Sequence, residues 1–389
     1  MEQHEILLAG SLLIGLVSII PPGIHYLRAE RASSVPNLSN APFPPPSVTV
    51  FIPARDEALL IRDKLEEILS LEYPGNNLRL LVIDSSSLDG TGRIAEKFLV
   101  ERAGSIPWQV ETMESPGKSI AVNKALGNIE TEFFVMTDVD SVLEPDSLLK
   151  LMRRFVENEE IGAVCGRIAV SEGMPMPAYR KRFNQIRLGE SSIDSTPIFE
   201  GSVCAFRMAS LAPREICSDI NADDSQLAIL SRRNGYRAIM DGEISFTESN
   251  LANEKQRQKS LRRAQGITRT LFRNRDLAFK GGRYGRIYLQ NLYFHLMMPW
   301  FVLLGLMLGI SSLFTFYFQS DIAGQEIYLS SILLLGLLSS TSVAREFLFG
   351  VACLLWAQIL IIVGVRLDVW KPHRAKLFSD YSQLKGSEE

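Results

Sequence analysis

Residues 133–141 have the sequence Phe-Phe-Val-Met-Thr-Asp-Val-Asp-Ser, in which a short apolar run ends at Asp138 and Asp140. A run of this length, rich in aromatic and β-branched residues, is typical of a buried strand. Open α/β folds bind their ligands at the carboxyl ends of such strands. Two carboxylates there, with no His or Cys nearby, suit a hard divalent cation that also holds phosphates. The plainer alternative is a polar turn in which one Asp caps the following helix.

Strands and helices alternate on both sides of this stretch. Upstream, strands are predicted at 47–53 and 78–84, and helices with one apolar face at 58–71 and 90–102. The alternation predicts an α/β fold with a mostly parallel, doubly wound sheet, which includes the strand at 133. Downstream, the pattern predicts a helix and a strand within 148–166, a helix at 178–188, a strand followed by a turn at 198–207, a helix at 224–235 and a strand at 238–240.

The apolar residues are concentrated at the two ends of the chain, which predicts an integral membrane protein with a soluble middle. An apolar segment at 6–20 closes at Pro21-Pro22 and is expected to anchor the chain. Two later segments, 296–318 and 347–365, are long enough for full crossings, whereas 327–338 is short. We therefore expect two full crossings in the C-terminal region.

Positive charges set the predicted orientation of the chain. Arg28 and Arg31 are the first basic residues, and they follow the N-terminal segment. The positive-inside rule then places the main domain in the cytosol, at the plasma membrane in a prokaryote. A signal peptide is the alternative for the N-terminal segment, but Glu2 and Glu5 stand where basic residues would be expected.

The overall charge and the cysteines exclude other classes of protein. The formal net charge is −3, which gives no indication of nucleic-acid binding. The four cysteines are scattered, without the spacing of a metal site or a disulfide framework. The strongly basic run from 254 to 275 has two interpretations, a solvated helix face or a surface attracted to anionic lipid headgroups.

Three more polar motifs accompany the central carboxylates. Asp84 ends a predicted strand and is followed by small polar residues, which allow a ligand to approach or simply make a tight corner. Lys118 lies in Gly-Lys-Ser, a turn that places a cation where phosphates could bind. The pair Asp223-Asp224 precedes a helix, where it provides an N-cap or leaves one carboxylate as a general base.

The order of these motifs from Val48 to about Arg269 resembles the family 2 inverting glycosyltransferases of the GT-A fold. The flanking apolar segments resemble the membrane-integrated branch of that family, which includes cellulose-, hyaluronan- and ceramide-glucosyltransferase-like enzymes. The matching stretches are 49–57, Asp84 with residues 86–91, Gly117, Lys118 and Asn123, residues 138–140, residues 201–207, and residues 223–227 with Gly235 and Tyr236.

The resemblance implies a role for each polar residue. The residues that would bind the nucleotide sugar are Asp84, Lys118, Asp138, Asp140 and Arg262. Those that would form the acceptor cleft are Gly201, Ser202, Phe206 and Asp223. Asp138 and Asp140 would also hold Mg²⁺ or Mn²⁺, with Asp140 as the more direct ligand. Asp224 would be the catalytic base that deprotonates an acceptor hydroxyl.

The resemblance also implies a division of the chain. It gives an N-terminal membrane anchor at 1–27, a Pro-rich linker at 28–46, a GT-A glycosyltransferase domain at 47–253, a basic interfacial segment at 254–286, a C-terminal transmembrane region at 287–370 and a cytosolic tail at 371–389. The implied partners are a nucleotide-diphosphate sugar, with UDP favoured, and a lipid or lipid-linked acceptor in the membrane.

One departure from the family pattern bears on the reaction. Polymerising relatives carry Gln-x-x-Arg-Trp after the base, whereas residues 259–263 here are Lys-Ser-Leu-Arg-Arg. Without that Trp, transfer of a single sugar is favoured over processive polysaccharide synthesis, which stays as the first alternative. A catalytically silent GT-A-like membrane scaffold is the second, and the complete set of carboxylates argues against it.

Overall fold

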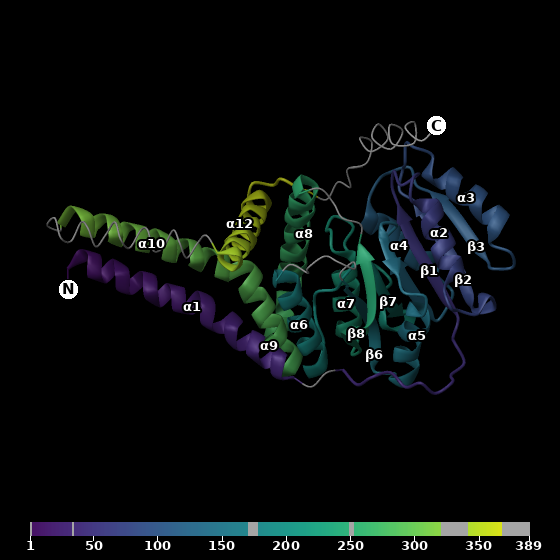
Figure 1. The fold of residues 1–389 in the computed structure, drawn as a ribbon, viewed down its shortest axis with the longest axis horizontal. Helices are drawn as coiled ribbons and strands as arrows, with labels where there is room; N and C mark the ends of the chain where they lie inside the picture. The colour runs from purple at the N-terminus through teal and green to yellow at the C-terminus, as the bar shows by residue number, and fades with distance from the viewer. Residues whose placement is uncertain (1, 33–34, 170–177, 249–252, 320–340, 368–389) are drawn as a thin grey trace.

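The computed structural model describes residues 2–32, 35–169, 178–248, 253–319 and 341–367. A sheet domain occupies one end of the molecule, and two long apolar helices project from it (Figure 1). The predicted segment at 327–338 and the tail at 371–389 lie outside the described residues.

One eight-stranded sheet forms the centre of the domain, in the order β3-β2-β1-β4-β7-β6-β8-β5. The strands β1 to β4 pair in parallel, while β7 runs antiparallel to both of its neighbours. The mostly parallel α/β fold expected from the sequence is therefore confirmed. The strands are β1 (Val48–Ala54), β2 (Leu78–Asp84), β3 (Trp108–Thr112), β4 (Phe133–Thr137), β5 (Ser141–Leu143), β6 (Ile161–Ile168), β7 (Val203–Arg207) and β8 (Arg237–Glu248).

Helices cover both faces of the sheet because alternate strand residues point to opposite sides. In β1, Val50 and Ile52 belong to one apolar core, and Phe51 belongs to the other. The first core is closed by α2 (Ile61–Ser70), α3 (Thr91–Arg102) and α5 (Ser147–Glu157). The second is closed by α4 (Lys118–Asn128) and α7 (Asp223–Arg233).

The sequence prediction lacked the strands β3 and β5, and two further parts of the domain differ from it. The stretch 198–207 is a loop followed by β7, not a strand followed by a turn, because residues 201–202 form a turn before the strand begins. Gly117-Lys118-Ser119 was predicted as a turn, but Lys118 is the first residue of α4 and Gly117 precedes the helix.

A third group of helices lies between the sheet and the apolar pair. It consists of α6 (Ala178–Ile193), α8 (Asn253–Arg273) and α9 (Gly282–Leu292). Residues of α7, α8 and α9 share a separate apolar cluster that includes Ile229, Leu271 and Tyr288. These helices therefore join the sheet domain to the apolar helices.

The N-terminal helix α1 (Gln3–Arg31) passes through Pro21 and Pro22, where the apolar run ends, and continues beyond the anchor predicted at 1–27. A proline has no N–H to donate to the carbonyl four residues earlier. The hydroxyl of Tyr293 donates to the carbonyl of Val17, the partner that Pro21 cannot serve. Tyr293 lies more than 270 positions away from Val17 in the sequence. The local sequence around the prolines therefore gives no sign of this interaction.

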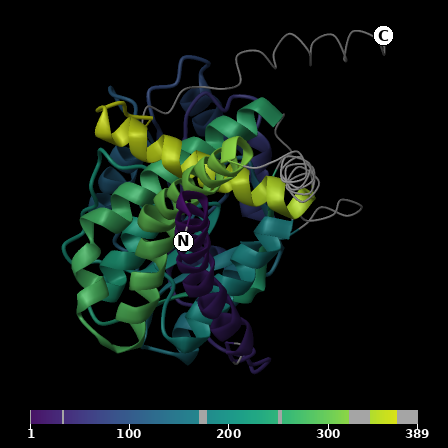
Figure 2. The same ribbon diagram turned by 90° about the vertical axis from the view of Figure 1, so that its left-hand side faces the viewer.

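Among the described residues, three helices are long and apolar enough to cross a membrane: α1, the continuous run Gly282–Gln319 that ends in α10 (Met298–Gln319), and most of α12 (Ser342–Ile362). α1 and α10 lie antiparallel (Figure 1). Ser11 donates to the carbonyl of Gly305 at 2.8 Å and Ser312 to that of His4 at 2.7 Å. Small residues allow this close approach. α12 instead crosses the base of the pair (Figures 1 and 2).

The end of α1 docks tightly on α6. Gly189 faces the backbone of Ala29, so closely that a Cβ at this glycine would lie 2.2 Å from the Ala29 carbonyl oxygen. Next to it, the buried carboxylate of Glu190 contacts His25 Nε2 at 2.8 Å and accepts from Asn291 Nδ2 at 2.7 Å. The close approach of Gly189 in α6 to the backbone of α1, called the glycine crossing below, and the buried polar network around Glu190 therefore attach α1 to the domain.

The glycine crossing predicts opposite effects for two matched substitutions. Gly189→Ala should destabilise the protein by about 1–3 kcal/mol, because its new methyl group meets backbone that cannot move aside. Gly127→Ala, in α4, meets nothing within 4 Å and should stabilise by roughly 0.5–1 kcal/mol through helix propensity. Thermal unfolding of both variants measures the difference. Equal midpoints for the two variants would contradict the tight crossing.

Candidate active site

A polar cavity of about 120 Å³ lies where the end of β4 meets the first turns of α4 and α7. One wall comes from the loop before β7 and another from α8. The residues that line it include Lys118, Asp138, Glu200, Gly201, Ser202, Asn221, Asp223, Asp224, Lys259, Arg262 and Arg263. Seven of the predicted site residues are thus brought together, from five separate parts of the chain.

The strand β4 ends at Thr137, and Asp138 to Asp140 form a turn before β5. The ammonium of Lys118 donates to Asp138 Oδ1 at 2.7 Å. Burial alone would raise the pKa of Asp138, but Lys118, with Lys259 and Arg262, outweighs it and holds that pKa below its usual value. Asp138 is therefore an ionised group facing several cations.

A buried lysine that the sequence did not indicate supports this turn. Lys64 of α2 is 2% exposed and donates to the carbonyl of Ser141 at 2.9 Å and to Glu67 at 3.2 Å. Burial lowers the pKa of Lys64, although the charges of Glu67, Asp138 and Asp140 oppose the shift. Lys64 thus fixes the backbone directly after Asp140.

The two acidic residues at the start of α7 have different surroundings. Asp223 accepts a hydrogen bond from Ser119 Oγ, and its other oxygen lies 3.8 Å from Lys118 Nζ. Asp224 is 9% exposed, and burial raises its pKa to about 6, with Asp223 adding to the shift while Arg263 and Lys118 oppose it. Asp223 is thus held in place by Ser119 and Lys118. Asp224 has the pKa of a group that can accept a proton near neutral pH.

The loop opposite Asp224 leaves space in front of its carboxylate. A Cβ at Gly201 would lie only 3.3 Å from Asp224 Oδ2. The residue before α7, Ala222, has a φ of 96°, a left-handed conformation that is unfavourable for alanine. Strained backbone of this kind is often found beside functional groups.

The basic helix α8 turns several of its cations toward the protein rather than toward solvent. Lys259, Arg262 and Arg263 line the cavity. Arg269 donates to Asp219 Oδ2 at 2.8 Å. The sequence interpretation of a solvated or lipid-facing helix surface does not apply to these four residues, because carboxylates from the sheet domain face them.

Glu200 is a central residue that the sequence analysis missed. Its side chain is buried and pairs with Arg187 of α6 and, at 2.5 Å, with Arg263 of α8. Burial would raise the pKa of Glu200, but the two arginines lower it to about 2. Its partners lie 13 and 63 residues away, so no local pattern could have revealed the triad.

Three predicted site residues do not line this cavity. Phe206, expected at the acceptor cleft, is fully buried between Phe134 and Phe199, so that expectation is wrong. Its position in β7 directs it into the second core. Asp84 accepts from the amides of Ser87 at 2.9 Å and Gly92 at 3.0 Å. Asp84 therefore stabilises the turn between β2 and α3. Its contact with a nucleoside stays a prediction.

Asp140, the third of these residues, is half-buried at the end of the turn. Within the ranges that the structure describes, no group of three or more His, Cys, Asp or Glu side chains gathers as a metal site. Two carboxylates nevertheless suit Mg²⁺ or Mn²⁺, which commonly takes one or two from the protein and the rest from substrate phosphates and water. The donor set of Asp138 and Asp140 therefore fits a metal that binds together with a nucleotide.

Comparisons with known proteins agree with this architecture. The family model described as "Glycosyl transferase family 2" matches residues 49–214. The "Probable glycosyltransferase YdaM" of Bacillus subtilis is 29% identical over 148 residues, 38% of this chain and 34% of that protein. A beta-monoglucosyldiacylglycerol synthase from Nostoc is 26% identical over 159 residues, 41% of this chain and 33% of that protein. The chain thus matches about a third of the length of these relatives.

A solved structure matches over nearly the whole chain. It is a mannosyltransferase from Pyrobaculum calidifontis in complex with GDP-Man and Mn²⁺, with a TM-score of 0.76 and 25% identity. The match covers 91% of this chain and 98% of that one, so it includes the helices outside the sheet domain. The GT-A-like sheet, the matching family model and this neighbour agree, and they identify residues 49–214 as a domain of glycosyltransferase family 2, a family of EC 2.4 enzymes.

Proposed function

We propose that the protein transfers one sugar from a nucleotide-diphosphate donor to a hydroxyl group of a lipid acceptor, with inversion at the anomeric carbon. The observation that carries this proposal is Asp224, a buried carboxylate with a pKa of about 6 beside a cluster of cations. An alcohol needs a base to become a good nucleophile at neutral pH. A single base and a single displacement lead to inversion.

The cations of the cavity suit the leaving group of such a reaction. As the glycosidic bond to the donor breaks, negative charge develops on the nucleoside diphosphate. Lys118, Arg262 and Lys259 line the same cavity as Asp224 and would stabilise that charge. A divalent ion held by Asp138 and Asp140 would supply further charge stabilisation when bound.

The proposed sugar donor is a class of compound, the nucleotide-diphosphate sugars, and not one named sugar nucleotide. The neighbouring mannosyltransferase was solved with GDP-Man and Mn²⁺, which supports a nucleotide-diphosphate sugar and a divalent ion here. UDP, favoured by the sequence resemblance, stays a prediction. Release of nucleoside diphosphate from a panel of UDP- and GDP-sugars would identify the donor.

A lipid acceptor is supported by the apolar helices and by one relative. In the part of the chain that the structure describes, three helices are long and apolar enough to cross a membrane, and a relative is a synthase of monoglucosyldiacylglycerol. Arg28 and Arg31 at the domain end of α1 favour a cytosolic catalytic domain. The cavity would then receive its acceptor from the inner leaflet.

Arg263 supports a single transfer over processive synthesis. By the sequence resemblance, Arg263 corresponds to the Trp that polymerising relatives use as an acceptor platform, and it pairs with Glu200. A guanidinium engaged with a buried carboxylate offers no free aromatic face to a growing sugar chain. Sizing the product made from a labelled donor tests this point, and a ladder of long chains would favour the polysaccharide synthase.

Removal of divalent metal should abolish transfer. Incubation with EDTA is expected to stop release of nucleoside diphosphate, and added Mg²⁺ or Mn²⁺ should restore it. Asp140→Asn should weaken metal-dependent donor binding, as measured by titration calorimetry. Asp146→Asn, which alters a half-buried carboxylate paired with Lys150, should not. Full activity in EDTA would contradict the metal site and favour charge stabilisation by the cations alone.

Replacement of the base should slow turnover without weakening the donor complex. Asp224→Asn is expected to lower kcat by about 10²–10⁴-fold, the usual contribution of a general base, with donor affinity almost unchanged. Asp276→Asn, which alters an exposed carboxylate paired with Arg233 at the far end of α7, is the control and should keep kcat. If Asp224→Asn turns over within a few-fold of the wild type, the acceptor oxygen is already anionic, as in a polyprenyl phosphate.

The raised pKa of Asp224 predicts how activity depends on pH. The base must be ionised, and burial raises its pKa to about 6, so kcat should fall about tenfold per unit as the pH drops below 6. Asp223→Asn removes a neighbouring negative charge that contributes to the shift, and it should move this acidic limb to lower pH. If kcat of the wild type begins to fall only near pH 4, Asp224 is not the base.

A further inference from the structure

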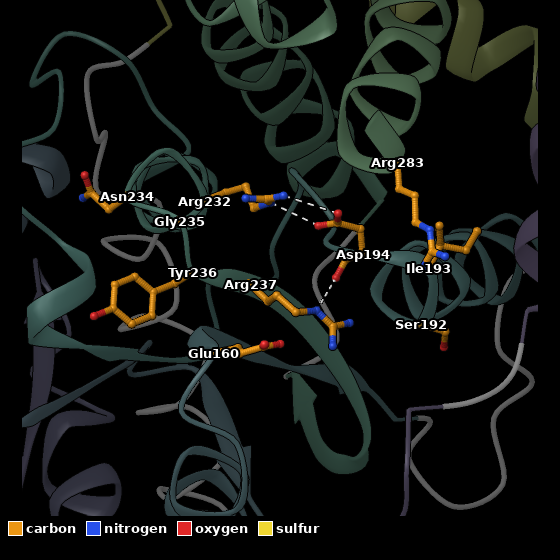
Figure 3. Close-up of a pocket in the computed structure, with 10 residues that line it drawn as sticks. All are labelled: Glu160, Ser192, Ile193, Asp194, Arg232, Asn234, Gly235, Tyr236, Arg237 and Arg283. Carbon is orange, nitrogen blue, oxygen red and sulfur yellow. Dashed lines mark hydrogen bonds and ion pairs between the residues drawn. The ribbon is translucent and has the colours of Figure 1, made fainter. Parts of the chain in front are cut away.

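A second cavity lies outside the candidate active site. Its volume is about 640 Å³, within the range of small-molecule sites. It opens where the C-terminal ends of α6 and α7 meet the first turn of α9 and the start of β8 (Figure 3). It shares no lining residue with the active-site cavity, and it lies at the opposite end of α7 from Asp224.

Two arginines are held in place at this cavity by the end of α6. Arg232 forms a two-point ion pair with Asp194, at 3.1 and 3.3 Å. Arg237 donates to the carbonyl of Asp194 at 2.9 Å and to that of Ser191 at 2.6 Å. Arg232 is therefore neutralised, while Arg237 is oriented by carbonyl groups that leave its positive charge uncompensated.

A third arginine approaches from the other wall. Arg283, in the first turn of α9, points toward the end of α6 and into the cavity (Figure 3). Among the described residues it makes no hydrogen bond or ion pair. Glu160 is the one lining carboxylate, besides Asp194, that could offset Arg237 and Arg283, so the described lining carries one excess positive charge.

We propose that this cavity binds the phosphate group of a phosphorylated small molecule or lipid headgroup, held between Arg237 and Arg283. A guanidinium presents paired donors that match phosphate oxygens. Arg237 is already oriented, which lowers the entropic cost of binding. The volume exceeds that of a phosphate ion, which leaves room for the remainder of the ligand between Ser192 and Tyr236.

Inorganic phosphate tests the site in the full chain, reconstituted in phosphatidylcholine nanodiscs. The thermal unfolding midpoint is measured against phosphate concentration, with chloride at equal ionic strength as the reference. Wild type should show saturable stabilisation. Arg283→Gln should need about tenfold more phosphate or higher, because it loses a charge-assisted contact. The difference between these two proteins separates the site from the cations of the active site.

Two further variants make the test specific. Arg286→Gln lies on the same helix outside the cavity, where Arg286 donates to the carbonyl of Gly282 at 3.3 Å, and it should behave as wild type. Glu160→Gln removes the opposing charge and should bind phosphate roughly threefold more tightly. Identical curves for wild type and Arg283→Gln, or equal losses in Arg283→Gln and Arg286→Gln, would overturn the proposal.

Anionic lipid distinguishes the two sources of the phosphate group. The titration is repeated in nanodiscs that contain phosphatidic acid. If the site takes a lipid headgroup, wild type should be stabilised before phosphate is added and respond little to it, while Arg283→Gln should not be stabilised. If the ligand is soluble, the wild-type titration should be the same in both kinds of nanodisc.

Discussion

The buried ion triad of Arg187, Glu200 and Arg263 is the constraint on which the rest of the site depends. It joins α6 and α8, two helices outside the sheet, to the loop that precedes β7. Removing one partner of such a group leaves an uncompensated charge, at a cost of roughly 3–5 kcal/mol. The loop that contains Gly201 therefore keeps its place opposite Asp224 only while both helices are docked.

The same triad influences the pKa of Asp224, the proposed base. The positive charge of Arg263 opposes the rise in the pKa of Asp224 that burial produces. Because Arg263 is shared with Glu200, its charge is partly neutralised, and Asp224 keeps a pKa of about 6. Arg263 thus has an electrostatic role as well as a structural one.

The sequence predicted the parts of the protein that depend on short-range pattern. The alternation of apolar runs gave the sheet and most of its helices, and the position of Asp138 at a strand end and of Asp224 at a helix start placed both in one cavity. Phe206 was misassigned because motif matching cannot tell which face of a strand points to the core. Glu200 and Lys64 were missed because their surroundings come from distant parts of the chain.

The helix α1 is a further example of a feature that local sequence patterns do not predict. Two adjacent prolines are a local signal for a helix end, yet α1 continues through them, and Tyr293 donates from another helix to the carbonyl that Pro21 leaves without a donor. Likewise, the basic composition of α8 suggested a solvated surface. Only the folded arrangement pairs Arg263 and Arg269 with carboxylates.

The docking of α1 on α6 has a consequence for how the protein is made. α1 is synthesised before α6, and the partner of its His25 is 165 residues further along. At about 5–20 residues per second, roughly ten to thirty seconds of synthesis separate the two. If α1 enters the bilayer as it emerges, it waits there before Glu190 and Gly189 exist. The folding domain then closes onto a helix already in the lipid, so assembly of the enzyme finishes at the membrane surface.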